Sequence, residues 1–135
     1  MKIMIDTNIL ISAVLFPKGK ASRALQKSLL PPYQPMISDY ILEEFKNKFS
    51  EKFPDEKEEM EAFLKPFLCL VSVVETPETE EPAEGKIRDP KDRPIIRAAI
   101  KHKVDLFLTG DKDFLESTVD NPQILSADEF LKMYV

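Results

Sequence analysis

Hydrophobic residues in this 135-residue chain occur either in short continuous runs or in longer stretches where they recur every three or four positions. Continuous apolar runs predict buried strands, here over residues 3–5, 35–38, 70–74, 106–108 and 124–125. Helical spacing predicts helices over residues 9–14, 21–30, 41–49, 55–64, 94–100 and 126–133. Strands that alternate with helices favour an α/β domain with a parallel sheet.

Local signals refine two of these elements. Asp55 and Glu58 resemble a capping box at the start of one helix, and Pro66 predicts a kink or an end in the same helix. The β-branched run over 70–74 favours a strand near the edge of the sheet.

Negative charge is concentrated in one polar segment. The formal net charge is −5, and residues 75–84 contain five glutamates with no lysine or arginine. The remainder is therefore neutral, so the overall acidity does not argue against a polyanionic partner. We predict that residues 75–85 form an exposed acidic loop, too polar and proline-rich to pack, in a single domain spanning 1–135.

The counts of cysteine and histidine limit the chemistry open to the protein, and the pattern of apolar residues bears on where it is located. Cys69 is the only cysteine and His102 the only histidine, which excludes a disulfide framework and disfavours zinc chemistry. The first residues lack a signal-peptide pattern, and no apolar run approaches the roughly 20 residues of a membrane span. We therefore expect a cytoplasmic protein without a membrane partner.

Four acidic residues occupy positions that a parallel sheet brings to one edge. Asp6 and Asp111 follow predicted strands, Glu44 lies in the helix after the second strand, and Asp92 is at a helix start. The carboxyl ends of parallel strands and the N-termini of the following helices share one edge of the sheet. We therefore expect all four carboxylates in one cleft.

Clustered carboxylates repel one another unless a cation or proton lies among them. Oxygen ligands without histidine or cysteine favour Mg²⁺ or Mn²⁺, and such sites suit phosphoryl transfer on a phosphodiester.

Each acid also has an alternative interpretation. Asp6 and Asp92 could simply cap helices, Asp111 could be a turn residue, and Glu44 could face solvent. Neighbouring acids compete for the same positions: Glu43 with Glu44, Asp89 with Asp92, and Asp113 with Asp111. Proximity to the strand end favours Asp111, and the helix-cap position favours Asp92.

The motifs Ile5-Asp6-Thr7-Asn8, Ser38 with Glu44-Phe45, Asp89-Pro-Lys-Asp92 and Leu108-Thr-Gly-Asp111-Lys-Asp113-Phe114 together resemble the PIN-domain pattern. The chain is most similar to the VapC-like toxin branch of toxin–antitoxin systems. The resemblance implies a three-layer α/β sandwich with a central, mainly parallel sheet flanked by helices. It also favours Glu44 over Glu43, because the family has a bulky apolar residue directly after this acid.

The resemblance further implies a metal-dependent endoribonuclease whose acidic quartet is Asp6, Glu44, Asp92 and Asp111. Asn8 and Thr109 would orient the first and last of these acids. The same resemblance implies an RNA substrate, a cognate antitoxin and a homodimer.

Basic residues form two clusters that could contact RNA phosphates or simply face solvent. One contains Lys18, Lys20, Arg23 and Lys27, and the other runs from Arg88 to Lys103 and includes Arg93 and Arg97. We expect the RNA to be single-stranded or looped, because a cleft enzyme needs an accessible backbone.

Two other functions are compatible with parts of this pattern. The domain could be a non-catalytic PIN-like module that binds RNA or protein, which an intact quartet disfavours. It could also be another Mg²⁺-dependent phosphate-processing domain. A dehalogenase-type phosphatase would normally have a second Asp where this chain has Asn8, and a receiver-like domain would have an acidic pair near its first strand.

Overall fold

The sheet is five-stranded and fully parallel in the computed structural model, which describes residues 1–133. Its strands are β1 (Lys2–Ile5), β2 (Gln34–Ser38), β3 (Ser72–Val74), β4 (Leu106–Leu108) and β5 (Gln123–Leu125). Their order is β3-β2-β1-β4-β5, so β1 is central and β3 lies at an edge, as predicted. Positions 134 and 135 of the predicted domain lie outside the described residues.

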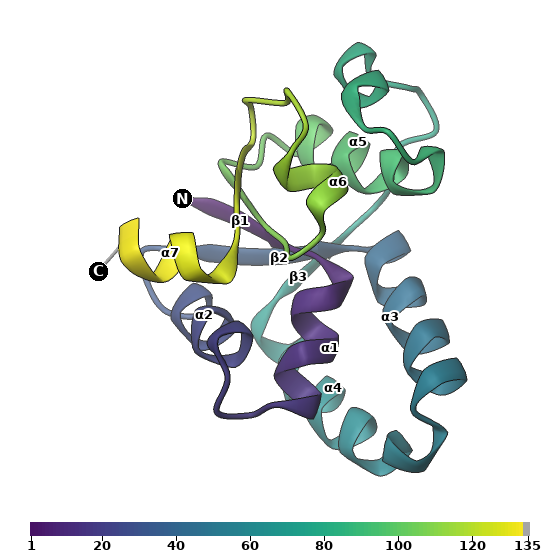
Figure 1. The fold of residues 1–135 in the computed structure, drawn as a ribbon, viewed down its shortest axis with the longest axis vertical. Helices are drawn as coiled ribbons and strands as arrows, with labels where there is room; N and C mark the ends of the chain where they lie inside the picture. Colours follow the sequence, from purple (N-terminus) through teal and green to yellow (C-terminus); the bar gives the residue numbers. More distant parts are fainter. Residues whose placement is uncertain (134–135) are drawn as a thin grey trace.

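Seven helices and three short 3₁₀ turns connect and cover the strands. The helices are α1 (Thr7–Leu15), α2 (Lys20–Ser28), α3 (Asp39–Lys52), α4 (Lys57–Leu70), α5 (Arg93–Lys101), α6 (Lys112–Leu115) and α7 (Ala127–Met133) among the described residues. The 3₁₀ turns are η1 (Pro54–Glu56), η2 (Pro82–Lys86) and η3 (Pro90–Asp92). Figure 1 shows the sheet nearly edge-on, with α1 to α4 on one side and α5 and α6 on the other. This arrangement confirms the predicted three-layer α/β fold.

Apart from Lys2 at the start of β1, the residues of β1 and β4 are hydrophobic, because these strands are covered on both faces. Ile3, Met4 and Ile5 of β1 are fully buried, as is Phe107 of β4. The buried stripe of α3, formed by Ile41, Phe45 and Phe49, packs into the same core. A rigid, dry sheet therefore supports the loops at its carboxyl edge.

Of the two effects predicted for Pro66, an end of the helix does not occur. α4 continues past Pro66 to Leu70, so the strand that follows begins only at Ser72. Pro66 cannot donate to the carbonyl of Ala62, but both residues are exposed, so water can bond to that carbonyl. The predicted capping box at Asp55 is also wrong, because Asp55 lies in η1 and α4 begins after Glu56 without a side-chain cap.

The acidic segment is packed in its second half, contrary to the prediction of an exposed loop over 75–85. Glu84 lies in η2, is only 4% exposed, and pairs with Arg97 of α5 at 2.8 Å between Oε2 and Nε. Lys101 pairs with Glu81 at 3.2 Å. The segment can pack because α5 supplies cations for its carboxylates.

None of the helices within residues 1–133 is long and apolar enough to cross a membrane.

Candidate active site

The acids lie where the direction of strand order reverses, between β1 and β4. In open parallel sheets, ligands bind in the crevice at this point, beyond the carboxyl ends of the strands. The Asp6 N–H donates to the carbonyl of Leu108 at 2.9 Å, so the ends of β1 and β4 are joined directly at the site.

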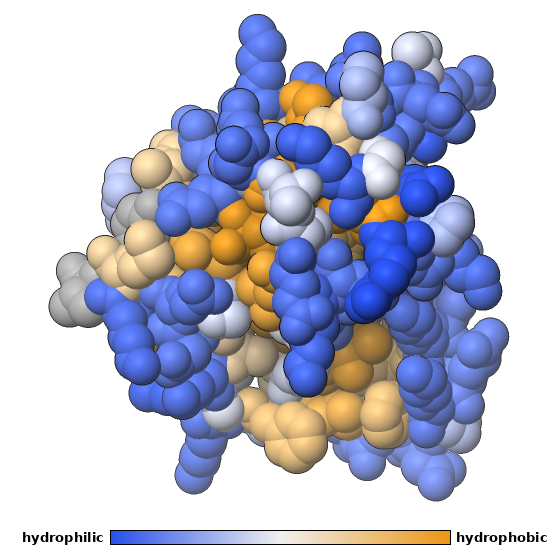
Figure 2. Space-filling model, turned by 45° about the horizontal axis from the view of Figure 1, so that its top comes forward, coloured by the Kyte–Doolittle hydropathy of each residue, from blue (hydrophilic) through white to orange (hydrophobic). Residues whose placement is uncertain are grey.

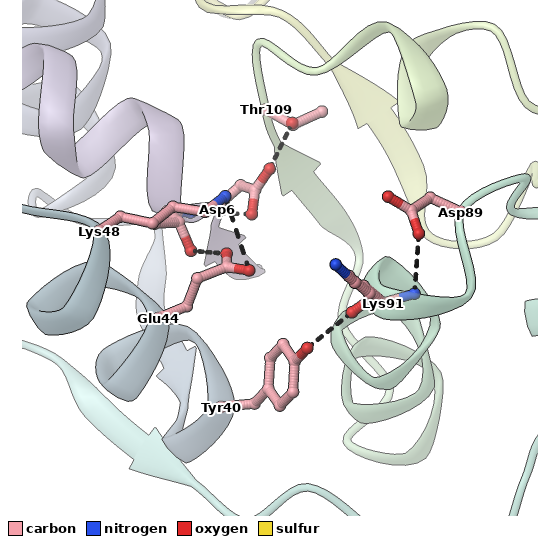
Figure 3. A network of polar contacts seen from close by, with 8 residues as sticks. Asp6, Tyr40, Glu44, Lys48, Asp89, Lys91 and Thr109 are labelled. Carbon is pink, nitrogen blue, oxygen red and sulfur yellow. Dashed lines mark hydrogen bonds and ion pairs between the residues drawn. The ribbon is translucent and has the colours of Figure 1, made fainter. Parts of the chain in front are cut away.

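Asp6 is buried and held by two hydrogen bonds. Its side chain is at the N-cap of α1, where Oδ1 accepts from the Thr7 N–H at 2.8 Å. Oδ2 accepts from the Thr109 hydroxyl at 2.7 Å, a contact visible in Figure 3. Asp6 therefore has both the capping contact of the alternative interpretation and a second contact that orients its carboxylate toward the site.

Thr109 and Asn8 organise the loop after β4 in different ways. Thr109 donates to Asp6 and accepts from the Asp111 N–H at 3.0 Å, so it lies between the first and last acids. Asn8 accepts from the Gly110 N–H at 3.1 Å and so holds the loop, rather than a carboxylate, in place.

Glu44 is held from α1, whereas Glu43 is exposed. The Thr7 hydroxyl donates to Glu44 Oε1 at 2.5 Å, and Lys48 Nζ lies 3.7 Å from Oε2. Sequence reasoning assigned no role to Thr7, although its position directly after Asp6 places it beside both acids. The structure thus brings Glu44, and not Glu43, to Asp6 (Figure 3).

Asp92 occupies the predicted N-cap position of α5, but its side chain forms no capping bond. Asp89 caps η3 instead, because its Oδ1 accepts from the Lys91 N–H at 3.0 Å. The Asp92 carboxylate is thus available to the site, which removes the simple capping interpretation.

Asp89 and Asp113 lie in one group of acids with Asp92. Ligand oxygens of Asp89, Asp92 and Asp113 lie within 4.8 Å of one another, a grouping that could hold a cation. Asp111 caps α6 by accepting from the Asp113 N–H at 2.9 Å. The structure therefore separates Glu43 from the other acids, and it places Asp89 and Asp113 beside Asp92.

The carboxylates influence one another electrostatically. Burial raises the pKa of Asp6 to about 7, against the lowering effect of Thr109 and Thr7, and Glu44 and Asp111 raise it further by repulsion. The pKa of Asp92 is raised to about 6, mainly by burial and further by repulsion from Asp111, Asp89 and Glu44. The charges of Glu44 and Asp111 thus act on both Asp6 and Asp92.

Tyr40 lies beside the acids, a position that the sequence did not predict. Its hydroxyl donates to the carbonyl of Lys91 at 2.7 Å, which ties α3 to η3 across the site (Figure 3). Burial raises the pKa of Tyr40, and nearby Glu44, Asp92 and Asp89 add to this effect.

The donor set fits a divalent cation of the Mg²⁺ type. The groups are carboxylate oxygens, which hard cations prefer. Burial, with repulsion from neighbouring carboxylates, raises the pKa values of Asp6 and Asp92. Bound cations reverse this local effect by favouring the ionised carboxylates.

Several basic residues predicted to contact RNA have intramolecular partners in the structure. Lys20 pairs with Asp128 at 2.8 Å, and Arg93 donates to the carbonyl of Ile87 at 2.9 Å. Arg97 is occupied by Glu84, whereas Lys18 and Arg23 are exposed.

Known structures share this fold over nearly the whole chain. VapBC2 from Rickettsia felis, bound to a promoter DNA fragment, has a TM-score of 0.71 at 18% identity and covers 93% of this chain and 98% of its own. A toxin–antitoxin complex from Klebsiella pneumoniae has a TM-score of 0.63 at 21% identity, covering 93% and 97%. VapC20 from Mycobacterium tuberculosis, a sarcin–ricin loop cleaving toxin, has a TM-score of 0.61 at 16% identity, covering 84% and 93%.

A sequence comparison identifies the family. No curated protein sequence matches the chain significantly. The PIN domain family matches residues 2–113, a range that includes every acid of the site from Asp6 to Asp113. With this match and the shared architecture, the chain belongs to the PIN domain family.

Proposed function

We propose that this protein is a metal-dependent endoribonuclease that hydrolyses phosphodiester bonds of RNA. The observation that carries the proposal is geometric: Thr7 contacts both Asp6 and Glu44, Thr109 contacts both Asp6 and Asp111, and Asp92 lies in one group with Asp89 and Asp113. Carboxylates that are held this close without a compensating cation destabilise the fold, so their arrangement is best explained by a bound cation.

In this proposal Asp6, Glu44, Asp92 and Asp111 would hold Mg²⁺ or Mn²⁺, with Asp89 and Asp113 close by. When bound, such an ion lowers the pKa of water and stabilises negative charge that develops on the phosphate. Thr109 and Thr7 fix the orientation of the Asp6 carboxylate, and Thr7 also fixes Glu44. Burial of Asp6 excludes bulk water from that side of the site.

We further propose that the protein is the toxin of a toxin–antitoxin pair, acting on RNA in the cytoplasm as a homodimer that a cognate antitoxin neutralises. Support comes from the shared fold of VapBC2 and the Klebsiella complex, the latter an assembly of a toxin with its antitoxin. The sarcin–ricin loop cleaving activity of VapC20 supports RNA as the substrate.

The test is cleavage of a labelled single-stranded RNA by the purified protein with Mg²⁺, with Mn²⁺ and with EDTA. We expect cleavage only with a divalent ion, and none from Asp6→Asn. Glu43→Gln provides a matched control for Glu44→Gln, because the two glutamates are adjacent but only Glu44 contacts Thr7. We expect Glu44→Gln to lower the rate at least about tenfold, as loss of a group that organises a metal site does, and Glu43→Gln to leave it unchanged.

Cleavage that survives both EDTA and Asp6→Asn would contradict the mechanism. Metal-independent RNA binding without any cleavage would support the non-catalytic module instead.

A further inference from the structure

A hollow of about 230 Å³ lies beside the acids and is lined by Lys86, Arg88, Lys112, Asp113, Glu116 and Ser117. We call it the basic hollow, because three of its six residues carry positive charge. Asp113 belongs both to this hollow and to the acidic group with Asp89 and Asp92, so the two features are contiguous. Figure 2 shows that the end of the molecule bearing α5 and α6 is covered mainly by hydrophilic side chains.

Arg88 is the only one of the three cations with a side-chain partner within the described part of the chain. Its guanidinium group binds Asp113 through Nε, at 3.1 Å from Oδ1, and through a terminal nitrogen. The Arg88 side chain is nevertheless 77% exposed, whereas that of Asp113 is 25% exposed. Arg88 therefore remains accessible from solvent while it neutralises an acid of the site.

Lys86 and Lys112 differ from Lys48 and Arg97, which have carboxylate partners. Both are exposed, and neither forms an ion pair within residues 1–133. By contrast, Lys48 pairs with Glu44, and Arg97 pairs with Glu84. Two uncompensated ammonium groups and one accessible guanidinium group thus line the same small hollow.

We propose that the basic hollow is a phosphate-binding subsite for the RNA strand, one that receives a phosphate neighbouring the cleaved one. This inference rests on the proposed function, because a strand whose phosphodiester lies at the acids must continue along an adjoining wall. Arg88 exchanges Asp113 for this phosphate, since guanidinium groups bind phosphate with two parallel hydrogen bonds. Lys86 and Lys112 attract the same phosphate as point charges on flexible side chains, which do not require a fixed geometry.

The test measures RNA binding separately from cleavage. Fluorescence anisotropy with a labelled single-stranded RNA of roughly ten nucleotides is recorded in Mg²⁺, in the Asp6→Asn background, over a range of salt concentrations. We expect Lys112→Ala and Lys86→Ala each to raise Kd about threefold, and to lower the slope of log K against log salt by about 0.7, the value for one lost contact on a single strand. Arg88→Ala is expected to act at least as strongly, and Arg88→Lys to restore most of the salt slope.

Lys65→Ala serves as the control, because it removes one positive charge from an exposed position on α4, outside both basic clusters. It should change neither Kd nor the salt slope. A melting temperature is recorded for every variant, so that misfolding is not read as lost binding.

Three outcomes would overturn the subsite. Kd and salt slope could be unchanged in Arg88→Ala and in the Lys86→Ala/Lys112→Ala double variant. Lys65→Ala could weaken binding as much as Arg88→Ala, which would show that any exposed positive charge contributes equally. The hollow variants could also retain RNA but lose an acidic peptide such as oligoglutamate, which would indicate a protein contact.

The proposed function fails separately, if the RNA is cleaved in the Asp6→Asn background or never cleaved by the wild type. In either case the anisotropy measurements, repeated in EDTA, still show whether the basic hollow binds RNA.

Discussion

The hydroxyl group of Thr109 donates a hydrogen bond of 2.7 Å to Oδ2 of Asp6, although 103 residues separate the two in the chain. Parallel pairing of β1 with β4 brings them together, since the pair Ile5 and Leu108 immediately precedes both residues. The same hydroxyl accepts from the Asp111 N–H. One buried oxygen atom therefore couples the first and the last acid of the candidate site.

Thr109→Val should uncouple these acids while keeping the shape of the side chain. It leaves Asp6 Oδ2 without this buried partner, so we expect a loss of about 1–3 kcal/mol in the free energy of unfolding. RNA cleavage should fall about 10- to 100-fold, as for other groups that orient metal ligands. Urea unfolding and cleavage rates check both effects, with Thr109→Ser as the control that keeps the hydroxyl. Cleavage by Thr109→Val at the wild-type rate would contradict this role of the hydroxyl.

The metal-free protein should lose stability as pH rises through the pKa of Asp6. That pKa is about 7 in the folded state against an ordinary value of 3.8, so the folded state binds the proton more tightly than the unfolded chain. The resulting stabilisation is complete below the unfolded value and is lost as pH rises through the folded value. Asp6→Asn removes this titration. Melting temperatures of the variant and the wild type are compared in EDTA. The difference, variant minus wild type, should rise as pH increases from the unfolded-state pKa of Asp6 to its folded-state pKa. A constant or falling difference would contradict the raised pKa of Asp6.

Divalent cations should reverse that loss. A cation that binds only the folded protein adds about 2.7 kcal/mol of stability when it is present at roughly 100 times its Kd. We expect Mn²⁺ to raise the melting temperature more above the pKa values of Asp6 and Asp92 than below them, because protons compete for both carboxylates at low pH. Thermal scans with and without Mn²⁺ measure this difference. If Mn²⁺ raised the melting temperature equally in wild type and in the Asp6→Asn/Asp92→Asn variant, the cation would bind at a different site.

Arg97 should contribute to the stability of the fold rather than to RNA binding. Its side chain is 15% exposed and pairs with Glu84, whose side chain is 6% exposed, so Arg97→Ala leaves a buried carboxylate unpaired. We expect a loss of about 3 kcal/mol in the free energy of unfolding, which breaking a buried pair typically costs. Urea unfolding tests this, and the Glu84→Gln/Arg97→Met double variant should recover much of the loss. Weaker RNA binding at unchanged stability would instead support Arg97 as a phosphate contact.

Sequence patterns were most informative where burial dictates residue type. The apolar run before Asp6 and that before Thr109 predicted the two central strands, because strands covered on both faces tolerate few polar residues. The shared edge of the four acids followed from parallel topology alone.

The remaining features depend on contacts between segments far apart in the chain. Whether Asp89 or Asp92 caps its turn is decided by the backbone of η3, and the grouping of Asp89 with Asp113 depends on how two loops meet. Burial of Glu84 requires Arg97, which lies on another element. Composition could not reveal this partner, so residues 75–85 resembled a solvated loop.

The pairing of β1 with β4 also determines when the site can form during synthesis. β1 is made long before its neighbour β4 and the acid at position 111, since β1 ends at Ile5 and β4 begins at Leu106. Contacts of such long sequence separation form late in folding. A nascent or truncated chain that ends before β4 therefore carries Asp6 and Glu44 without their partners, and we expect it to be inert on the ribosome that makes it.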